Sequence, residues 1–327
     1  MNLQLRIQET LLLSDRPSRP GREEQSLQDT CHTEEKGMTM SKKQRLAATL
    51  APIRKIYSDG VYEGSVNAEG ERHGSGVMTY SGGDIYAGEW VDDVTEGLGT
   101  ILYADGDKYA GQFWRGDFHG RGKYVYKNGD SYDGEWKNDA FDGEGSYISH
   151  NGSTYRGTWK EDKMHGRGKY LDGSGNLYEG DFCQGRFHGA GKMKYINGDH
   201  YEGEYRLGKR HGQGTYKDAD GNTYVGMWSE NKRSGLGTLR DAMGGTYEGR
   251  YCRGVRDGPG IYRWPEGQLD VTNCSNDVRV GVGVGWSNDR SCAWRMIDGE
   301  YAGDLSLAEA HQVVEALGLG SDELTRS

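Results

Sequence analysis

The sequence predicts an all-β protein: an elongated, single-sheet antiparallel β-meander of stacked hairpins, with a short C-terminal helix as a cap and a disordered N-terminus. Three observations predict this fold class. Glycine accounts for 54 of the 327 residues, against a usual share of about 7%. Tyrosine recurs every 23 residues, with one interval of 24, and such internal periods are typical of repeat architectures. No proline occurs between Pro52 and Pro259, as a hydrogen-bonded β-ladder requires.

Each repeat begins with a tyrosine that is followed two residues later by a glycine. The nine tyrosines are Tyr62, Tyr86, Tyr109, Tyr132, Tyr155, Tyr178, Tyr201, Tyr224 and Tyr247. A Gly-x-Gly pair lies near the middle of each repeat, and a fourth glycine closes it. A tenth repeat is degenerate, because Asp270 stands where the tyrosine is expected while Gly281 and Gly283 keep the phase.

Each repeat is predicted to be a β-hairpin. In Tyr132-Asp-Gly134-Glu-Trp136, ring and polar residues alternate with the period of two expected for a strand with one covered face. Gly134 lies on the same face as the two rings, so rings from neighbouring strands can lie over its backbone. Dipeptides such as Asn128-Gly129 and Asn197-Gly198 close the repeats and tolerate the positive φ of tight hairpin turns.

The chain is predicted to have three segments. Residues 1–56 are poor in aromatic residues and mixed in charge, which is typical of disorder. Residues 57–269 form the repeat meander, and residues 270–327 form the degenerate repeat, a final hairpin and a helix. Ser306-Leu-Ala-Glu309 is a capping-box pattern that starts this helix. Laid over the last strand, the helix would protect an exposed sheet edge; a partner-binding helix is the alternative.

Composition excludes several classes of function. A net charge of −10 makes the chain a poor general ligand of nucleic acid, so no nucleic-acid partner is predicted. No stretch approaches the ~20 apolar residues of a membrane-spanning helix. The five cysteines are odd in number and contain no Cys-x-x-Cys, which favours free thiols in a reducing cytosol. We therefore predict a cytoplasmic protein.

A column of histidines is the strongest candidate for chemistry: His73, His119, His165, His188 and His211. Adjacent members should lie one repeat apart, about 9.6 Å, which is too far for two ligands of one zinc ion. We interpret them as turn histidines that bond to the backbone. Segments such as 185–192 imitate phosphate loops but lack the strand-then-helix context. We predict a protein that is not an enzyme, with no catalytic residues, no metal site and no cofactor.

Two surfaces are candidates for binding. The first is the aromatic face, predicted to form a groove for a partner protein; the alternative is that its rings pack on each other and close the groove. Its residues are Tyr86, Trp90, Tyr109, Tyr132, Trp136, Tyr155, Trp159, Tyr178, Tyr201, Tyr224 and Trp228. The second is a basic ridge at the turns, where Lys209, Arg210, Lys232 and Arg233 could contact acidic phospholipids. Each cation near an anionic bilayer is worth about 1 kcal/mol; solvated turn residues are the alternative.

The repeat resembles the MORN (membrane occupation and recognition nexus) repeat. Tyr201-Glu-Gly-Glu-Tyr-Arg-Leu-Gly-Lys-Arg-His-Gly-Gln-Gly214 matches that pattern throughout, whereas Glu96, Asp142, Ser234 and Asp257 replace its histidine. The resemblance implies a non-enzymatic scaffold or adaptor for partner proteins, cytoskeletal or ciliary, similar to radial-spoke-head proteins. It leaves two alternatives: a peripheral protein that binds acidic phospholipids at the plasma membrane, and a repeat-only relative of the regulatory region of phosphatidylinositol phosphate kinases.

Overall fold

The computed structural model describes residues 52–320 and Leu324. Among these residues, 23 strands belong to one open sheet, and one helix, α3 (Leu307–Ala316), follows the last strand. The predicted all-β fold class is confirmed. The predicted disorder of residues 1–51 lies outside the described residues. Residues 53–57 form a strand, so the meander begins slightly before the predicted boundary, because their backbone pairs with the next strand from Ile53 opposite Gly64 to Tyr57 opposite Gly60.

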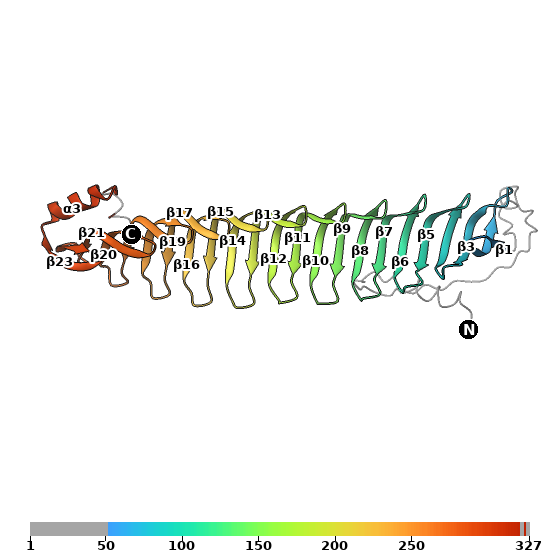
Figure 1. Cartoon of the computed structure of the whole chain (residues 1–327), viewed down its shortest axis with the longest axis horizontal. Helices are drawn as coiled ribbons and strands as arrows, with labels where there is room; N and C mark the ends of the chain where they lie inside the picture. The colour runs from blue at the N-terminus through green and yellow to red at the C-terminus, as the bar shows by residue number, and fades with distance from the viewer. Residues whose placement is uncertain (1–51, 321–323, 325–327) are drawn as a thin grey trace, which may run out of the picture. The chain divides into compact units, whose positions relative to one another are not determined.

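The described chain divides into two compact units between Gly120 and Arg121. Consecutive strands within each unit pair antiparallel (Figure 1). The strands of the first unit are β1 (Ile53–Tyr57), β2 (Gly60–Val66), β3 (Arg72–Tyr80), β4 (Ile85–Val91), β5 (Val94–Leu102) and β6 (Lys108–Trp114), and β7 (Asp117–Val125) contains the division.

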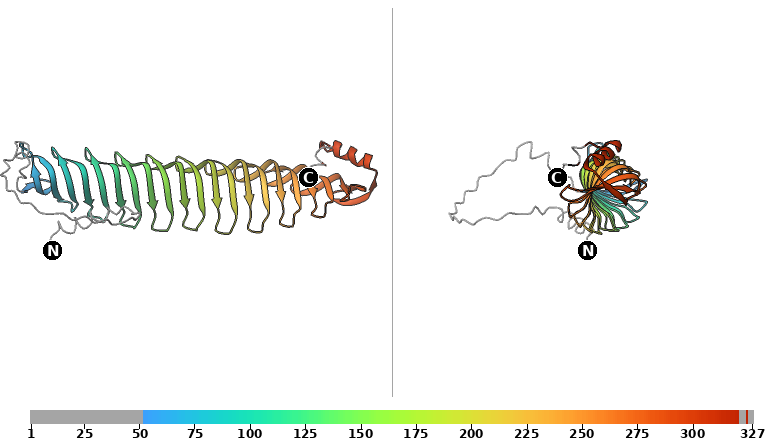
Figure 2. Two further views of the ribbon diagram at one scale, coloured as in Figure 1. Left: turned by 180° about the vertical axis from the view of Figure 1, so that it is seen from behind. Right: turned by 90° about the vertical axis from the view of Figure 1, so that its left-hand side faces the viewer.

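The second unit alternates seven-residue and nine-residue strands up to its last two strands, which have five and six residues. Its strands are β8 (Ser131–Lys137), β9 (Ala140–Ile148), β10 (Thr154–Lys160), β11 (Lys163–Leu171), β12 (Leu177–Cys183), β13 (Arg186–Lys194), β14 (His200–Arg206), β15 (Lys209–Lys217), β16 (Thr223–Ser229), β17 (Lys232–Arg240), β18 (Thr246–Cys252), β19 (Val255–Arg263), β20 (Leu269–Ser275), β21 (Val278–Trp286), β22 (Ala293–Ile297) and β23 (Glu300–Leu305). Seen end-on in Figure 2, these strands fan out, as expected of a twisted sheet.

The glycines let a tyrosine ring lie flat against the sheet. Gly180 pairs with Gly191 across β12 and β13. A Cβ on Gly191 would lie 2.4 Å from the Tyr178 hydroxyl, and that hydroxyl donates a hydrogen bond to the carbonyl of Asp181 at 2.9 Å. The predicted covering of glycine by rings is therefore confirmed: the Tyr178 ring lies over Gly180 of its own strand and over Gly191 of the neighbouring strand.

The rings form a continuous chain across successive repeats. Tyr178 contacts Phe182 of its own repeat at 5.1 Å and Tyr205 of the next repeat at 5.2 Å between ring centroids, both edge to face. Each such pair contributes about 0.5–1.5 kcal/mol beyond burial of its area. Stability is therefore built from contacts within a repeat and between neighbouring repeats.

Two kinds of turn connect the strands. Inside a repeat, both turn residues have positive φ, as in Glu161 (47°) and Asp162 (62°), which defines a type I′ turn. Between repeats, only the glycine does: Gly198 has φ 95°, while the Asn197 carbonyl Oδ1 accepts the N–H of Asp199 at 3.1 Å. The predicted Asx-Gly dipeptides thus close the wider loops, and mostly non-glycine residues form the tight turns.

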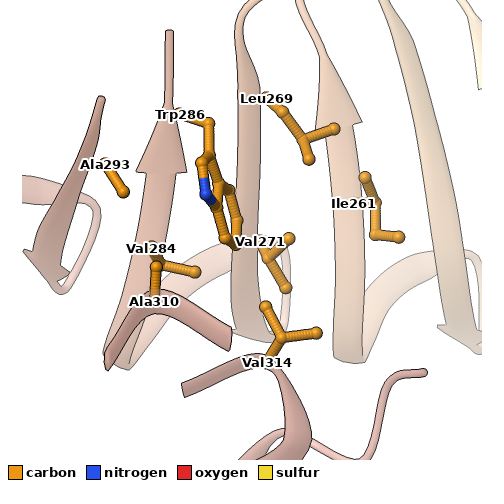
Figure 3. Packing of buried hydrophobic residues seen from close by; sticks show 8 residues of the cluster. All are labelled: Ile261, Leu269, Val271, Val284, Trp286, Ala293, Ala310 and Val314. Carbon is orange, nitrogen blue, oxygen red and sulfur yellow. The ribbon is translucent and has the colours of Figure 1, made fainter. Parts of the chain in front are cut away.

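Helix α3 covers a face of the sheet. The predicted capping box is confirmed, since the Ser306 hydroxyl accepts the N–H of Glu309 and the Glu309 carboxylate accepts the N–H of Ser306. Ala310 and Val314 of α3 point at apolar strand residues in Figure 3. The cluster consists of Ile261, Leu269, Val271, Val284, Trp286, Ala293, Ala310 and Val314. As predicted, the helix contacts the last strand, β23, but its buried side chains pack mainly on the apolar face of β19–β22.

Candidate functional site

The aromatic column predicted to line a groove is buried. The most exposed of its eleven residues, Trp159, has 7% of its surface exposed, and Tyr109 and Tyr132 have none. These residues are buried because each tyrosine ring lies on its own pair of glycines and is covered by rings from the same and the next repeat. The rings therefore pack on one another, which was the alternative interpretation of this face. The eleven residues are Tyr86, Trp90, Tyr109, Tyr132, Trp136, Tyr155, Trp159, Tyr178, Tyr201, Tyr224 and Trp228.

A second layer of side chains forms the accessible surface on this tyrosine face. In the described part of the second unit, partly buried Tyr147, Met164 and Tyr170 surround a hollow of about 390 Å³ with Tyr155 and Trp159 at its floor. We call it the first hollow. A second hollow, of about 400 Å³, is lined by Arg210, Tyr216, Asp218, Asn222, Tyr224, Trp228, Asn231, Lys232, Arg233, Leu239 and Gly254. The sequence signal for these hollows was the apolar column in the nine-residue strands, whose members Tyr147, Tyr170, Tyr216 and Leu239 line them.

Two arginines of the predicted basic ridge lie against rings. The Arg210 guanidinium stands 4.3 Å from the Trp228 ring centroid, and that of Arg233 stands 4.9 Å from Tyr251. Both also donate to carbonyls of the following turn, Arg210 to Asn231 at 3.1 Å and Arg233 to Gly254 at 2.8 Å. These residues are therefore recessed on the tyrosine face.

The two lysines of the ridge are exposed. Lys209 forms an ion pair with Glu230, and Lys232 lines the second hollow. Phospholipid binding by Lys209, Arg210, Lys232 and Arg233 stays a prediction, but two of its four cations do not project from the turns.

The turns are tied to one another by side-chain oxygens. The carboxylate of Asp93 accepts the backbone N–H of Arg72 at 2.9 Å and its Nε–H at 2.8 Å. In the second unit, Asn231 accepts the N–H of Arg210 at 2.9 Å in the same way. The backbone hydrogen bond from Arg72, together with its guanidinium, holds the pKa of Asp93 below its usual 3.8.

This gives a pH prediction for Asp93. A lowered folded-state pKa stabilises the protein above the unfolded value, and the contribution is lost as the pH falls through the folded value. We expect wild-type stability to fall more steeply than that of Asp93→Asn between about pH 5 and pH 2, because asparagine keeps the acceptor without the charge. Denaturant unfolding at a series of pH values checks this, and parallel curves for the two proteins would contradict it.

The histidine column was the strongest candidate for chemistry in the sequence. Among the described residues, no group of three or more histidine, cysteine, aspartate or glutamate side chains is placed to hold an ion. The predicted hydrogen bond from these histidines to the backbone is not found at Nδ1. This atom is buried without a hydrogen-bond partner in His119, His165, His188 and His211. No helix in the described part of the chain has the length and hydropathy of a membrane span.

The opposite face of the second unit carries a larger hollow, of about 750 Å³, over β9–β15. Glycines form its floor and charged side chains form its walls, including Glu144, Lys192 and Glu202. Lys192 and Glu202 form an ion pair at 2.8 Å. The wall charges partly satisfy one another, so this hollow offers less to a ligand than the tyrosine face does.

Comparisons with known proteins agree with the repeat. The MORN repeat family model matches residues 62–85, 86–108, 109–131, 132–154, 155–177, 178–200, 201–223, 224–246 and 247–269. No curated protein matches the chain. Among solved structures, the TCP10 domain of Danio rerio CPAP in complex with a STIL peptide is 10% identical, over 78% of this chain and 98% of that one, with a TM-score of 0.38. The SAS-4 TCP domain of Drosophila melanogaster in complex with a proline-rich motif of Ana2 is 15% identical, over 57% and 88%, with a TM-score of 0.25. The nine consecutive matches to the family model, which cover most of the chain, show that this chain belongs to the MORN-repeat family.

Proposed function

We propose that this protein is a non-enzymatic scaffold that holds partner proteins by an extended segment lying on the tyrosine face of β9–β12. One observation carries the proposal: partly buried Tyr147, Met164 and Tyr170 surround a hollow whose floor is already packed with rings. Extended peptides dock in such shallow, aromatic-lined grooves, and apolar side chains supply the affinity. The cytoskeletal or ciliary setting that the resemblance implies would supply partners of this kind.

A membrane-bound role is the second candidate, and the packing favours it less. Arg210 and Arg233 lie over rings and donate to carbonyls, and Lys209 is paired with Glu230. A flat anionic bilayer would reach the guanidinium groups poorly, because they are recessed beside the rings, and it would compete with Glu230 for Lys209. A solvated basic ridge of the kind that binds lipid surfaces would leave its cations free.

Tyr170→Glu should abolish partner capture. The substitution places a charge in the wall of the first hollow, where an apolar segment would otherwise be buried. Lys169→Glu is the matched control, because residue 169 is the neighbour in β11 and its side chain lies on the opposite face. Benzoylphenylalanine at position 170 or 169, followed by photo-cross-linking in cells and peptide mapping, measures the contact directly.

We expect cross-links from position 170 to map to one short segment of each partner, at least about tenfold above those from position 169. We also expect Tyr170→Glu to lose these partners while Lys169→Glu retains them. Equal cross-linking from both faces, or loss of the partners by Lys169→Glu alone, would contradict the proposal.

A further inference from the structure

The two hollows on the tyrosine face are copies of one site. They lie three repeats apart, and ten of the twelve lining positions of the first recur 69 residues later in the second. The matching pairs are Tyr147 with Tyr216, Ser149 with Asp218, Ser153 with Asn222, Tyr155 with Tyr224, Trp159 with Trp228, Asp162 with Asn231, Lys163 with Lys232, Met164 with Arg233, Tyr170 with Leu239 and Gly185 with Gly254. A ligand that spans both hollows would therefore meet the same shape twice.

The two copies differ in polarity because of one sequence column. This column covers the tyrosine rings: Phe141 stacks on Tyr132 at 3.7 Å between centroids and contacts Trp159 at 5.3 Å. Three repeats later Arg210 replaces it and stands 4.3 Å from Trp228. In the next repeat of each copy, Met164 is likewise replaced by Arg233. Apolar side chains at or beside the first hollow thus become guanidinium groups that line the second.

The second hollow carries an excess of positive charge. Arg210, Lys232 and Arg233 line it, against a single carboxylate, that of Asp218. Asp218 already accepts the backbone N–H and the side-chain amide of Asn222, both at 2.8 Å. The first hollow has Lys163 and Asp162 instead, one of each sign. An anionic side chain is therefore attracted to the second hollow and not to the first.

The arginines are held ready to bind. Arg233 uses Nε and Nη2 on the Gly254 carbonyl, at 3.1 and 2.8 Å, and a guanidinium has five donors in a rigid fork. The ring beneath and the carbonyl beside it fix its orientation, so little rotamer entropy remains to be lost when a carboxylate binds. A recessed, fixed guanidinium suits a side chain that reaches into a hollow better than it suits a flat bilayer surface.

We propose that the partner segment, whose existence rests on the function proposed above, is an extended peptide with an apolar side chain for the first hollow and an acidic side chain for the second. Three repeats of two strands at about 4.8 Å place the hollows about 29 Å apart. An extended chain rising about 3.3 Å per residue covers that distance in about nine residues. The partner is thus recognised by two features at a fixed separation.

The test uses the full chain and fluorescein-labelled peptides with a leucine pair and a glutamate pair about nine residues apart. In one peptide the leucine pair lies nearer the N-terminus, and in the other the glutamate pair does. We expect fluorescence anisotropy to show one order binding about tenfold tighter than the other, equivalent to about 1.4 kcal/mol. Changing its glutamates to glutamines should remove the advantage.

An exchange variant tests whether the arginine column sets this order. Phe141→Arg, Met164→Arg, Arg210→Phe and Arg233→Met together move the guanidinium groups to the first hollow, and the exchange should reverse the preferred peptide. An arginine is compatible with a tryptophan at this column, because Arg72 stands 4.4 Å from the ring of Trp90. Circular dichroism checks the fold, and Arg233→Gln alone should weaken the preferred peptide about fivefold if the exchange variant does not fold.

Three outcomes would overturn the inference. The first is that no peptide binds, and the second is that neither variant changes the preference between the two peptides. The third is that the protein binds phosphatidylserine vesicles instead of the peptides and that Arg233→Gln loses the vesicle binding. Failure of the proposed function is distinguishable, because it appears in the Tyr170 cross-linking experiment, which does not depend on any arginine. Cross-links at Tyr170 without a peptide order would reject the two-hollow recognition alone.

Discussion

Gly191→Ala is expected to destabilise the protein by about 3 kcal/mol, the upper part of the range for an overpacked core. The new Cβ would lie 2.4 Å from the Tyr178 hydroxyl and 2.5 Å from its Cε2 atom. The ring cannot move away at low cost, because its hydroxyl is bonded to Asp181 and its edge and face contact Phe182, Phe187 and Tyr205. Guanidinium unfolding followed by tryptophan fluorescence measures the loss.

The effect should also be local at first. Since each repeat contacts only its neighbours, the amides of β12 and β13 should lose protection from hydrogen exchange before those of distant strands. Gly82→Ala is the matched control: it lies in an exposed loop, and a Cβ there meets nothing within 4 Å. It should change stability by less than about 0.5 kcal/mol. Equal effects of the two substitutions would show that the ring does not depend on the glycine.

The periodicity was enough to predict the strands and their faces. A single Tyr-x-Gly-x-Trp segment is ambiguous, but nine copies in phase leave one arrangement in which all the tyrosines share a face. The structure agrees, with Tyr178, Tyr201 and Tyr224 all buried on the same face. The capping box at Ser306 was equally informative, because it depends on four consecutive residues and on nothing distant.

The groove could not be predicted, because alternation assigns a side chain to a face but not to a depth. Tyr132 and Tyr147 both lie on the tyrosine face, and alternation treats them alike, although the first is buried and the second is partly exposed. The difference arises from glycine: Tyr132 has Gly134 and Gly145 beneath its ring. The ring can therefore sink onto the backbone, and Tyr147 remains as the rim.

The arginine column shows how a charge can mislead. Arg210 follows Lys209 at a turn, where a solvated ridge is the ordinary expectation. The same column, however, holds Phe118, Phe141, Met164 and Phe187 in other repeats. A position that holds either a large apolar residue or arginine is typical of a side chain that packs on aromatic rings. A guanidinium stacks on an aromatic face, and it does so better than the ammonium group of lysine. Reading the column across repeats would have found the contact.

The position of α3 could also have been inferred from a change of pattern. Along the face opposite the tyrosines, repeats in the middle of the second unit carry charged residues such as Glu179 and Lys192, paired across the strands. The last repeats carry Ile261, Val271 and Val284 in the same row. An apolar stretch on an otherwise charged face needs a cover, and an amphipathic helix follows within the next residues.

Val314→Asp should therefore release α3 from the sheet. Val314 has 1% of its surface exposed and contacts the apolar cluster; the change loses about 1.5–3 kcal/mol of burial and adds the cost of placing a carboxylate in an apolar site. Undocking would leave Ile261, Leu269 and Val271 uncovered, and β20–β23 should then lose hydrogen-exchange protection while β8–β12 keep theirs. Gln312→Asp is the control, since residue 312 is exposed on the same helix. Uniform loss of hydrogen-exchange protection from β8 to β23 would contradict a local effect of α3. An equal effect of Gln312→Asp would show that the Val314 contact does not hold the helix on the sheet.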